Sequence, residues 1–385
     1  DQLELDDAPL APAHDSDAST ISSSPRRVLD SSAITRIIAE RVGQSPDAAI
    51  AVTDRDTFYI IFTSGSTGTP KGVEISASCL DHFFAWPLSL IGTTFDSEEP
   101  KTYLNQALFA FDLSVYELAM SLSSGGTLVC ADRELLTDLR AFFAFLAQAH
   151  TQVWSVTPSF LEMCLADRAF SSSLLPDLQT VLACGETFPA PVARKFLERF
   201  PDVNLYNTYG PTESTVAVTA VRITPEMATS KLPLPVGFPK PGTSISIIDP
   251  TIPSESFSAA GHRKHLPSLE QGEILISGTT VAKGYYRRDD LTRERFATGI
   301  AADNTRVFRT GDIGFLDDEG CLHCLGRADG QVKLNGFRIE LGDIENNLNA
   351  LPDIRDAVVL CVRHDGKPHH LVGFVCPDST AGIPK

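Results

Sequence analysis

No apolar run in this sequence approaches the ~20 residues that a membrane-spanning helix requires. Residues 1–27 are acidic and rich in serine, which is not the pattern of a secretory signal. A basic excess is also absent, since 32 Lys and Arg stand against 49 Asp and Glu for a net charge of −17. Such a surface does not neutralise nucleic acid or an anionic membrane, so we expect neither as a partner. A small polyanion remains open, because a local cluster of donors is enough to bind it.

Paired cysteines are also scarce. The eight cysteines are scattered singly, mostly in apolar stretches, which is typical of reduced, buried thiols and indicates a cytoplasmic protein. Cys321 and Cys324 form one CxxC, which could supply half of a zinc site. No second pair lies at a suitable spacing, so we favour an ordinary strand and turn here.

The 385 residues are too many for one compact core, so we expect two or more domains. Between residues 57 and 205, short apolar runs alternate with segments that carry apolar residues at helical spacing. This alternation predicts an α/β domain with a largely parallel sheet. The runs interpreted as buried strands are "TFYIIFT", "KTYLNQAL", "GGTLVCA", "TQVWSVTP" and "LQTVLACG", and those interpreted as helices are "RAFFAFLAQAH" and "APVARKFLERF".

The pattern changes on either side of this region. Residues 1–55 read as a weak βα segment with a stretch typical of disorder, "HDSDASTISSSP". Short strands joined by turns rich in Gly and Asp predict a β-rich part over about 236–328. A helical "IELGDIENNLNAL" and two further strands then predict the start of a small α+β domain over 329–385.

A loop of hydroxyls and glycines follows the first strong strand, in "YIIFTSGSTGTPKGVEIS". A Walker loop needs lysine directly after glycine and a hydroxyl after the lysine, whereas Lys71 lies between Pro70 and Gly72. The remaining donors still predict a phosphate site, because glycine N–H groups approach phosphate oxygens closely and hydroxyls add to them. These donors are Thr63, Ser64, Gly65, Ser66, Thr67 and Gly68.

Four further stretches carry polar residues, three of them at strand ends or in apolar surroundings. Asp112 in "FDLSVYEL" is either a helix cap or internal ion pair, or the counter-ion of a substrate ammonium group. "NTYGPTE" (residues 207–213) offers an aromatic ring for a purine, a hydroxyl for phosphate and a carboxylate for Mg²⁺, or it is an ordinary Gly-Pro turn. Asp312 in "RTGD" is an acid of the kind that binds a ribose diol. "GRADGQVK" is interpreted as a hinge or a solvated linker.

Taken in this order, the stretches resemble those of the adenylate-forming (ANL) enzymes, which include acyl-CoA synthetases and adenylation domains of nonribosomal peptide synthetases. The resemblance covers nearly the whole chain from Thr57 onward. Within that family, "FDLSVYEL", "VWSVTPSFLEMCL" and "LPVGF" are similar to amino acid–carrier protein ligases of the D-alanine type, which serve teichoic acid biosynthesis. The implied fold has a large α/β core over residues 1–328 and a mobile small domain.

The resemblance implies that ATP and a small amino acid give an aminoacyl-adenylate, and that the phosphopantetheine thiol of a carrier protein then takes the acyl group. Glu213 matches the Mg²⁺ position, Asp112 the acid that pairs with the substrate amino group, and Asp329 the hinge. Cys184 and Val216 match residues that line a small side-chain pocket. The implied ATP-binding residues are Thr63, Ser64, Gly65, Ser66, Thr67, Gly68, Lys71, Asn207, Thr208, Tyr209, Gly210, Pro211, Thr212, Asp312 and Arg327.

The catalytic lysine of the family lies near the end of its small domain, beyond Lys385, and its first strands lie further upstream. We therefore expect a fragment of a longer protein, and we assign the catalytic role to no lysine here, including Lys333 in the hinge strand. "VYEL" and "ADGQVK" lean towards peptide synthetases. Three interpretations thus stay open: a D-alanine-type ligase, an adenylation domain for another small amino acid, and a non-catalytic nucleotide-binding fragment.

Overall fold

The computed structural model describes residues 3–6, 26–29, 36–37, 39–41, 52–64, 70–95, 97–230, 233–252, 266–297, 306–327, 331–334, 337–364 and 367–377. The chain forms two compact units, residues 1–52 and 53–385. In the first unit β1 (Leu3–Asp6) and β2 (Arg26–Leu29) pair as antiparallel strands. The serine-rich stretch at 14–25 lies outside the described residues.

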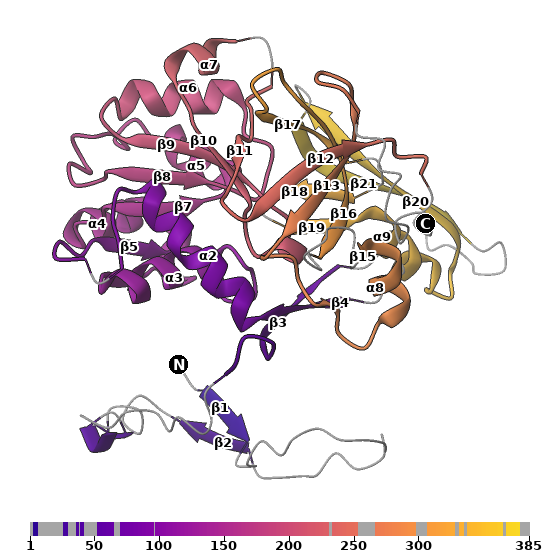
Figure 1. Ribbon diagram of the computed structural model, residues 1–385, viewed down its shortest axis with the longest axis horizontal. Coiled ribbons are helices and arrows are strands. Elements are labelled where there is room, and N and C mark those ends of the chain that lie inside the picture. Colours follow the sequence, from indigo (N-terminus) through magenta and orange to yellow (C-terminus); the bar gives the residue numbers. More distant parts are fainter. Residues whose placement is uncertain are drawn as a thin grey trace. The chain divides into compact units, whose positions relative to one another are not determined.

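A seven-stranded sheet is the centre of the second unit (Figure 1). Its order is β11-β10-β9-β8-β7-β5-β6, and the five strands from β6 to β9 are parallel. Only β10 and β11, at one edge, run antiparallel to their neighbours. The predicted α/β fold with a largely parallel sheet is therefore confirmed. The strands are β5 (Thr102–Asn105), β6 (Thr127–Cys130), β7 (Val153–Val156), β8 (Thr180–Ala183), β9 (Asn204–Tyr209), β10 (Thr219–Arg222) and β11 (Phe238–Pro239).

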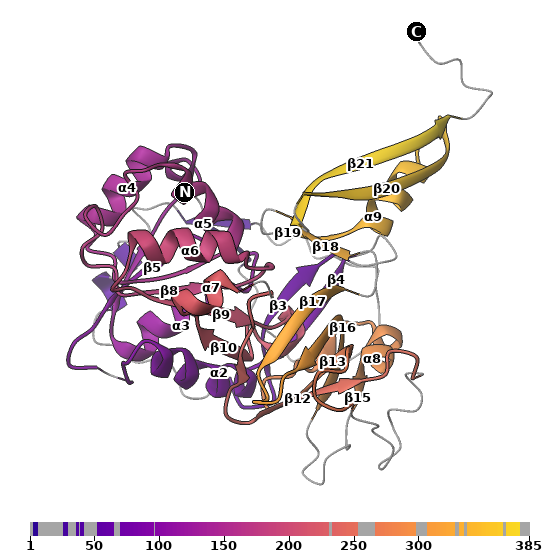
Figure 2. The same cartoon turned by 90° about the horizontal axis from the view of Figure 1, so that it is seen from above.

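Helices cover both faces of this sheet, and its inner strands β7 and β8 are fully buried as a result, whereas the edge strand β6, predicted as buried, is only partly so. One face packs on α4 (Leu139–Gln148), α5 (Pro158–Ala166) and α6 (Ala190–Arg199), and the other packs on α2 (Ala77–Leu90) and α3 (Ser114–Ser124) (Figure 2). Successive strand residues alternate between the two cores: Trp154 joins the first and Val153 the second. Short helical turns complete this part, namely η2 (Leu135–Thr137), η3 (Thr212–Ser214) and α7 (Pro225–Thr229).

The first predicted strand, "TFYIIFT", is not part of the parallel sheet, which corrects our expectation. It forms β3 (Thr57–Thr63), and pairs antiparallel with β4 (Lys71–Ser76), which in turn pairs with β14 (Gly284–Tyr285). The strand is also only half buried, since Phe58 and Phe62 are 56% and 62% exposed. The physical reason is the short connection, because residues 64–70 permit a hairpin but not the dozen-residue crossover that parallel strands need.

A five-stranded antiparallel sheet follows, as the β-rich pattern predicted. Its order is β12-β13-β16-β15, and β17 also pairs with β16. The elements are β12 (Thr243–Ile248), β13 (Gly272–Gly278), α8 (Asp289–Arg295), β15 (Phe296–Ala297), β16 (Val307–Leu316) and β17 (Leu322–Arg327).

The last described segments form two small antiparallel pairs and a helix. They are β18 (Gln331–Leu334), β19 (Phe337–Glu340), α9 (Leu341–Asn349), β20 (Ile354–His364) and β21 (Lys367–Pro377). The helix and strand patterns expected here are thus present, whereas the hinge residue Asp329 lies outside the described residues. Among the described helices, none combines the length and the apolar character needed to cross a membrane.

Candidate functional site

Two neighbouring cavities open at the carboxyl ends of the parallel strands, where ligands of α/β sheets usually bind. The first has a volume of about 660 Å³ and the second about 640 Å³. Both are lined by Gly185, just after β8, and by Gly210, just after β9. They also share Asp312, Arg327 and Lys333, so one acid and two cations lie at the boundary between them.

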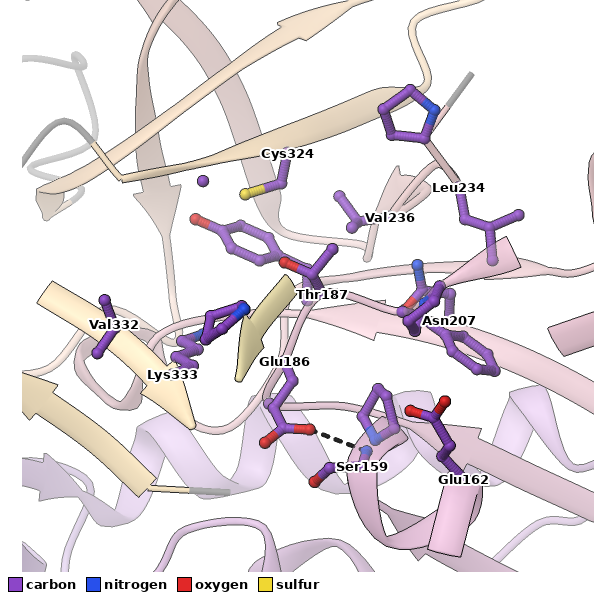
Figure 3. A pocket seen from close by; sticks show the side chains of 18 of the residues that line it. Ser159, Glu162, Glu186, Thr187, Asn207, Leu234, Val236, Cys324, Val332 and Lys333 are labelled. Atoms are coloured by element: carbon purple, nitrogen blue, oxygen red, sulfur yellow. Dashed lines mark hydrogen bonds between the residues drawn. The ribbon is translucent and has the colours of Figure 1, made fainter. Parts of the chain in front are cut away.

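The first cavity brings together Asn207, Tyr209, Asp312 and Arg327, which lie far apart in the sequence (Figure 3 shows this cavity with Asn207 labelled). The Tyr209 hydroxyl donates to Asp312 Oδ2 at 2.5 Å, and Arg327 donates to Asp312 Oδ1 at 3.1 Å. Asp312 and Arg327 are register partners across β16 and β17. Burial, and next the Asp312 charge, hold the pKa of Tyr209 well above its usual range, so the phenol remains a neutral donor.

The backbone around β9 explains part of the "NTYGPTE" pattern. Asn207 donates through its amide to the Pro235 carbonyl at 2.8 Å, and the Thr208 hydroxyl donates to the Ala183 carbonyl at 3.1 Å. A Cβ at Gly210 would lie 2.5 Å from the Ala217 Cα, so only glycine fits where the chain leaves the strand. Pro211 and Thr212 line the second cavity directly beyond it.

The second cavity brings together all three residues that we expect to contact an amino acid substrate, Asp112, Cys184 and Val216. Asp112 is half buried and directly precedes Leu113, the N-cap residue of α3. Burial raises the pKa of the Cys184 thiol to about 11, which keeps it neutral as a small apolar wall.

Val216 and its neighbour Thr215 have positive φ angles, 65° and 61°, in the left-handed region that a β-branched residue rarely adopts. The Thr215 hydroxyl donates to the Thr280 carbonyl at 2.8 Å and anchors this strained turn. Backbone strain held by surrounding contacts is common in binding sites, because it presents a side chain in one fixed direction. Here the presented side chain is that of Val216.

The predicted phosphate loop is described only at its two ends. Thr63 and Ser64 line the second cavity, whereas Gly65, Ser66, Thr67 and Gly68 lie outside the described residues. Lys71 does not line either cavity; its Nζ lies 5.2 Å from the centroid of the Tyr285 ring, a cation–π arrangement.

Glu213, the expected Mg²⁺ ligand, is fully buried and does not line either cavity. Its Oε1 accepts a hydrogen bond of 2.8 Å from the Tyr285 hydroxyl. A carboxylate has the oxygen chemistry that suits Mg²⁺, but this one is buried outside both cavities and already accepts from Tyr285. The arrangement of Glu213 seen here therefore does not fit the ion.

Two side chains at this site were missed from the sequence. Glu186 follows β8 in "ACGETF" and accepts a 2.9 Å hydrogen bond from the backbone N–H of Ser159, in the first turn of α5 (Figure 3). Its position three residues beyond the end of β8 was a usable signal. Lys333 of β18 lines both cavities, although the sequence placed it only in the hinge strand.

Comparison of the sequence with protein families gives a match to the AMP-binding enzymes over residues 3–286. A D-alanine–D-alanyl carrier protein ligase of Bacillus velezensis is 41% identical over 352 residues, which are 90% of this chain and 66% of that protein. The ligase of the same name from Bacillus cereus is 40% identical over 362 residues, covering 94% and 68%. The chain therefore spans about two thirds of the length of these curated relatives.

Solved structures show the same fold. The adenylation domain AlmE of Vibrio cholerae, in complex with glycyl-adenosine-5'-phosphate, has a TM-score of 0.71 and 27% identity, covering 85% of this chain and 59% of that chain. PA1221, a nonribosomal peptide synthetase protein with adenylation and PCP domains, has a TM-score of 0.72 and 26% identity, covering 88% and 65%. The family match covers well over half of the sequence, and the chain belongs to the AMP-binding enzymes.

Proposed function

We propose that the protein activates D-alanine with ATP and transfers it to the phosphopantetheine thiol of a carrier protein. The observation that carries this proposal is the second cavity, where Asp112, Cys184 and Val216 lie together beside the residues shared with the first cavity. A small neutral wall opposite one carboxylate suits a small amino acid with an ammonium group. The names of the relatives that are 40–41% identical support D-alanine.

In the first step a carboxylate oxygen of the amino acid forms a bond to the α-phosphorus of ATP. The bond from that phosphorus to the bridging oxygen breaks, and pyrophosphate leaves. Two anions must meet, so the site has to position them and offset their charge. Arg327 and Lys333, at the boundary of the two cavities, are placed to do so, and Asp112 would hold the ammonium group. Mg²⁺ bound with ATP would supply further neutralisation of the phosphates.

In the second step the carrier thiol attacks the acyl carbon, AMP leaves, and the thiol proton is released. We propose that residues 1–328 form the adenylating core and that 329–385 begin a small domain that rotates at Asp329 between the two steps. The reaction would take place in the cytoplasm, which agrees with eight cysteines that are all free thiols. If the protein acts as the D-alanine-type ligases do, its product would be used in teichoic acid biosynthesis.

The test is amino acid-dependent exchange of pyrophosphate into ATP by the full-length protein, compared over D-alanine, L-alanine, glycine and larger amino acids. We expect D-alanine to give the strongest exchange. Preference for a large or an L-configured amino acid would contradict the D-alanine assignment. An absence of exchange with every amino acid would favour the third interpretation, a non-catalytic nucleotide-binding fragment.

A second candidate is an adenylation domain of a peptide synthetase that activates another small amino acid. AlmE was solved with a glycyl-adenylate, and a four-domain nonribosomal peptide synthetase bound to AMP and glycine is 31% identical over 84% of this chain. Tyr116 and Glu117 of "VYEL" also favour this candidate. Glycine as the preferred substrate in the exchange assay would select it.

A further inference from the structure

The second cavity is larger than a small amino acid requires. Its volume of about 640 Å³ is typical of a site for a drug-sized ligand, whereas the side chain of alanine is a single methyl group. The three residues expected to contact the amino acid, Asp112, Cys184 and Val216, are only a few of those that line the cavity. The remaining space has room for a second occupant beside the amino acid.

The cavity is elongated along the carboxyl edge of the seven-stranded sheet. Cys184 directly follows β8, whereas Arg133, which also lines the cavity, follows the edge strand β6. The order β8-β7-β5-β6 separates these two strands by three spacings, which amount to about 14 Å. Between them the lining is largely apolar: Leu108 follows β5, and Phe160 and Met163 belong to α5, which follows β7. The cavity therefore suits a long, mostly uncharged chain.

Arg133 lies where this cavity meets solvent, because the residue lines the cavity and is exposed. Within the described parts of the chain, its guanidinium has no hydrogen bond or ion pair. The neighbouring Asp132 is engaged elsewhere, since its Oδ1 accepts from the Leu135 N–H at 2.7 Å. Arg327, by contrast, is held by Asp312 at the boundary with the first cavity. Arg133 is thus a cation available to an anionic group at the outer end of the cavity.

We propose that Arg133 binds the phosphate of the phosphopantetheine arm and so determines which thiol the second step accepts. This inference rests on the proposed function, in which that thiol takes the acyl group. The arm has a thiol at one end, a phosphate at the other and an uncharged chain between them. With the thiol beside the acyl group near Asp112, the chain would lie along the apolar wall and the phosphate would reach Arg133. A guanidinium donates to two phosphate oxygens at once, which makes it selective for that group.

Two small thiols and three variants isolate this contact. Pantetheine and 4'-phosphopantetheine differ only in the phosphate. Arg133→Gln removes the charge from an exposed side chain, which should leave the fold intact, and Arg133→Lys keeps the charge without the planar fork. The matched control is Arg140→Gln, because Arg140 is also exposed, lies on α4 and lines neither cavity.

The experiment measures thioester formation by the full-length protein with ATP, D-alanine and each thiol. We expect the wild type to favour 4'-phosphopantetheine about 10-fold in kcat/KM, the effect of a charge-assisted hydrogen bond. Arg133→Gln should use both thiols equally, Arg133→Lys should keep part of the preference, and Arg140→Gln should keep all of it. Pyrophosphate exchange should be the same in all variants, because the first step uses no thiol. An undiminished preference in Arg133→Gln would overturn the inference.

Direct binding of the two thiols, measured by isothermal titration calorimetry, separates this inference from the proposed function. If the wild type shows no amino acid-dependent exchange, the proposed function fails. Binding of 4'-phosphopantetheine that weakens in Arg133→Gln would still support the phosphate contact. Normal exchange with D-alanine but equal binding of the two thiols would overturn the role of Arg133 and leave the proposed function in place. A loss of ATP affinity in Arg133→Gln would place the guanidinium on the nucleotide and would also overturn the inference.

Discussion

The two faces of the seven-stranded sheet bury different chemistry. The face under α4, α5 and α6 is an apolar cluster rich in aromatic rings, in which Phe196 stacks on Phe200 at 4.7 Å. The face under α2 and α3 includes Tyr116 and Cys184 in its core, and Glu117 of α3 reaches the backbone of β7 there. Cys184 and Val216 of this second core line the proposed substrate cavity, whereas the first cluster reaches that cavity only through partly buried residues packed against it, Leu136 and Phe160. One face thus serves mainly stability, and the other combines stability with recognition.

Removing a ring from the aromatic face should give the largest effect on stability. We expect Phe196→Ala to lower the free energy of unfolding by about 3–5 kcal/mol, because it leaves a cavity in a fully buried cluster. Urea unfolding measures the loss, and Leu122→Ala, 72% exposed on α3, is the control that should change little. A changed KM for the amino acid in folded Phe196→Ala would break the proposed division between the faces.

The second face should show its chemistry in the pH dependence of stability. Glu117 is fully buried, with Oε1 accepting from the Ser155 N–H at 3.1 Å, and burial raises its pKa to about 8 from 4.5. A raised pKa means that the folded state holds the proton between these values, so stability falls as pH rises through this window and levels off above about 8. The slope is at most about 1.4 kcal/mol per pH unit.

The matched variant is Glu117→Gln, which mimics the protonated acid and should remove this slope. Its free energy of unfolding, measured at fixed pH values from 5 to 8.5, should diverge from that of the wild type as the pH rises. Glu198→Gln, whose side chain is 67% exposed on the other face, is the control and should keep the wild-type profile. Parallel pH profiles for the wild type and Glu117→Gln would contradict this assignment.

Asp112 tests recognition directly. Asp112→Ala should weaken binding of the amino acid about 10- to 100-fold, because the ammonium group loses its hydrogen-bonded charge partner. ATP affinity should change far less. Pyrophosphate exchange at varied amino acid and at varied ATP separates the two constants. Asp81→Ala, exposed on α2, should leave both unchanged. Equal losses for the two ligands would mean that Asp112 does not face the substrate.

Replacement of Cys184 should give the smallest effect, a change in the preferred size of the substrate side chain. Cys184→Ala enlarges the second cavity by one sulfur atom, so D-2-aminobutyrate should gain on D-alanine by up to about 10-fold in kcat/KM, the lower end for one methylene group. The exposed Cys130, replaced by alanine, should leave the ratio unchanged. An unchanged ratio in Cys184→Ala would show that this thiol does not limit side-chain size.

The sequence allowed most of the parallel strands to be predicted, because buried strands appear as continuous apolar runs. Of the helices that cover the sheet it indicated α4 and α6 but not α2, α3 and α5. It did not show how β3 pairs, since "TFYIIFT" reads the same in either sheet and only the length of the loop decides. Motif order allowed Asp112, Cys184 and Val216 to be brought together as one site. The contact of Tyr285 with Glu213 and the position of Lys333 in the lining of both cavities depend on tertiary packing between segments far apart in the sequence. No local pattern encodes such packing.

The hydrogen bond from Tyr209 to Asp312 joins β9 of the seven-stranded sheet to β16 of the five-stranded sheet. Both residues line the first cavity, so a nucleotide bound there would touch both sheets at once. Such a ligand would also stabilise the contact between the two sheets, because its binding free energy is lost when they separate. Saturating ATP should therefore raise the temperature at which the two sheets separate. Tighter binding of the nucleotide would then leave the two sheets less free to shift relative to each other.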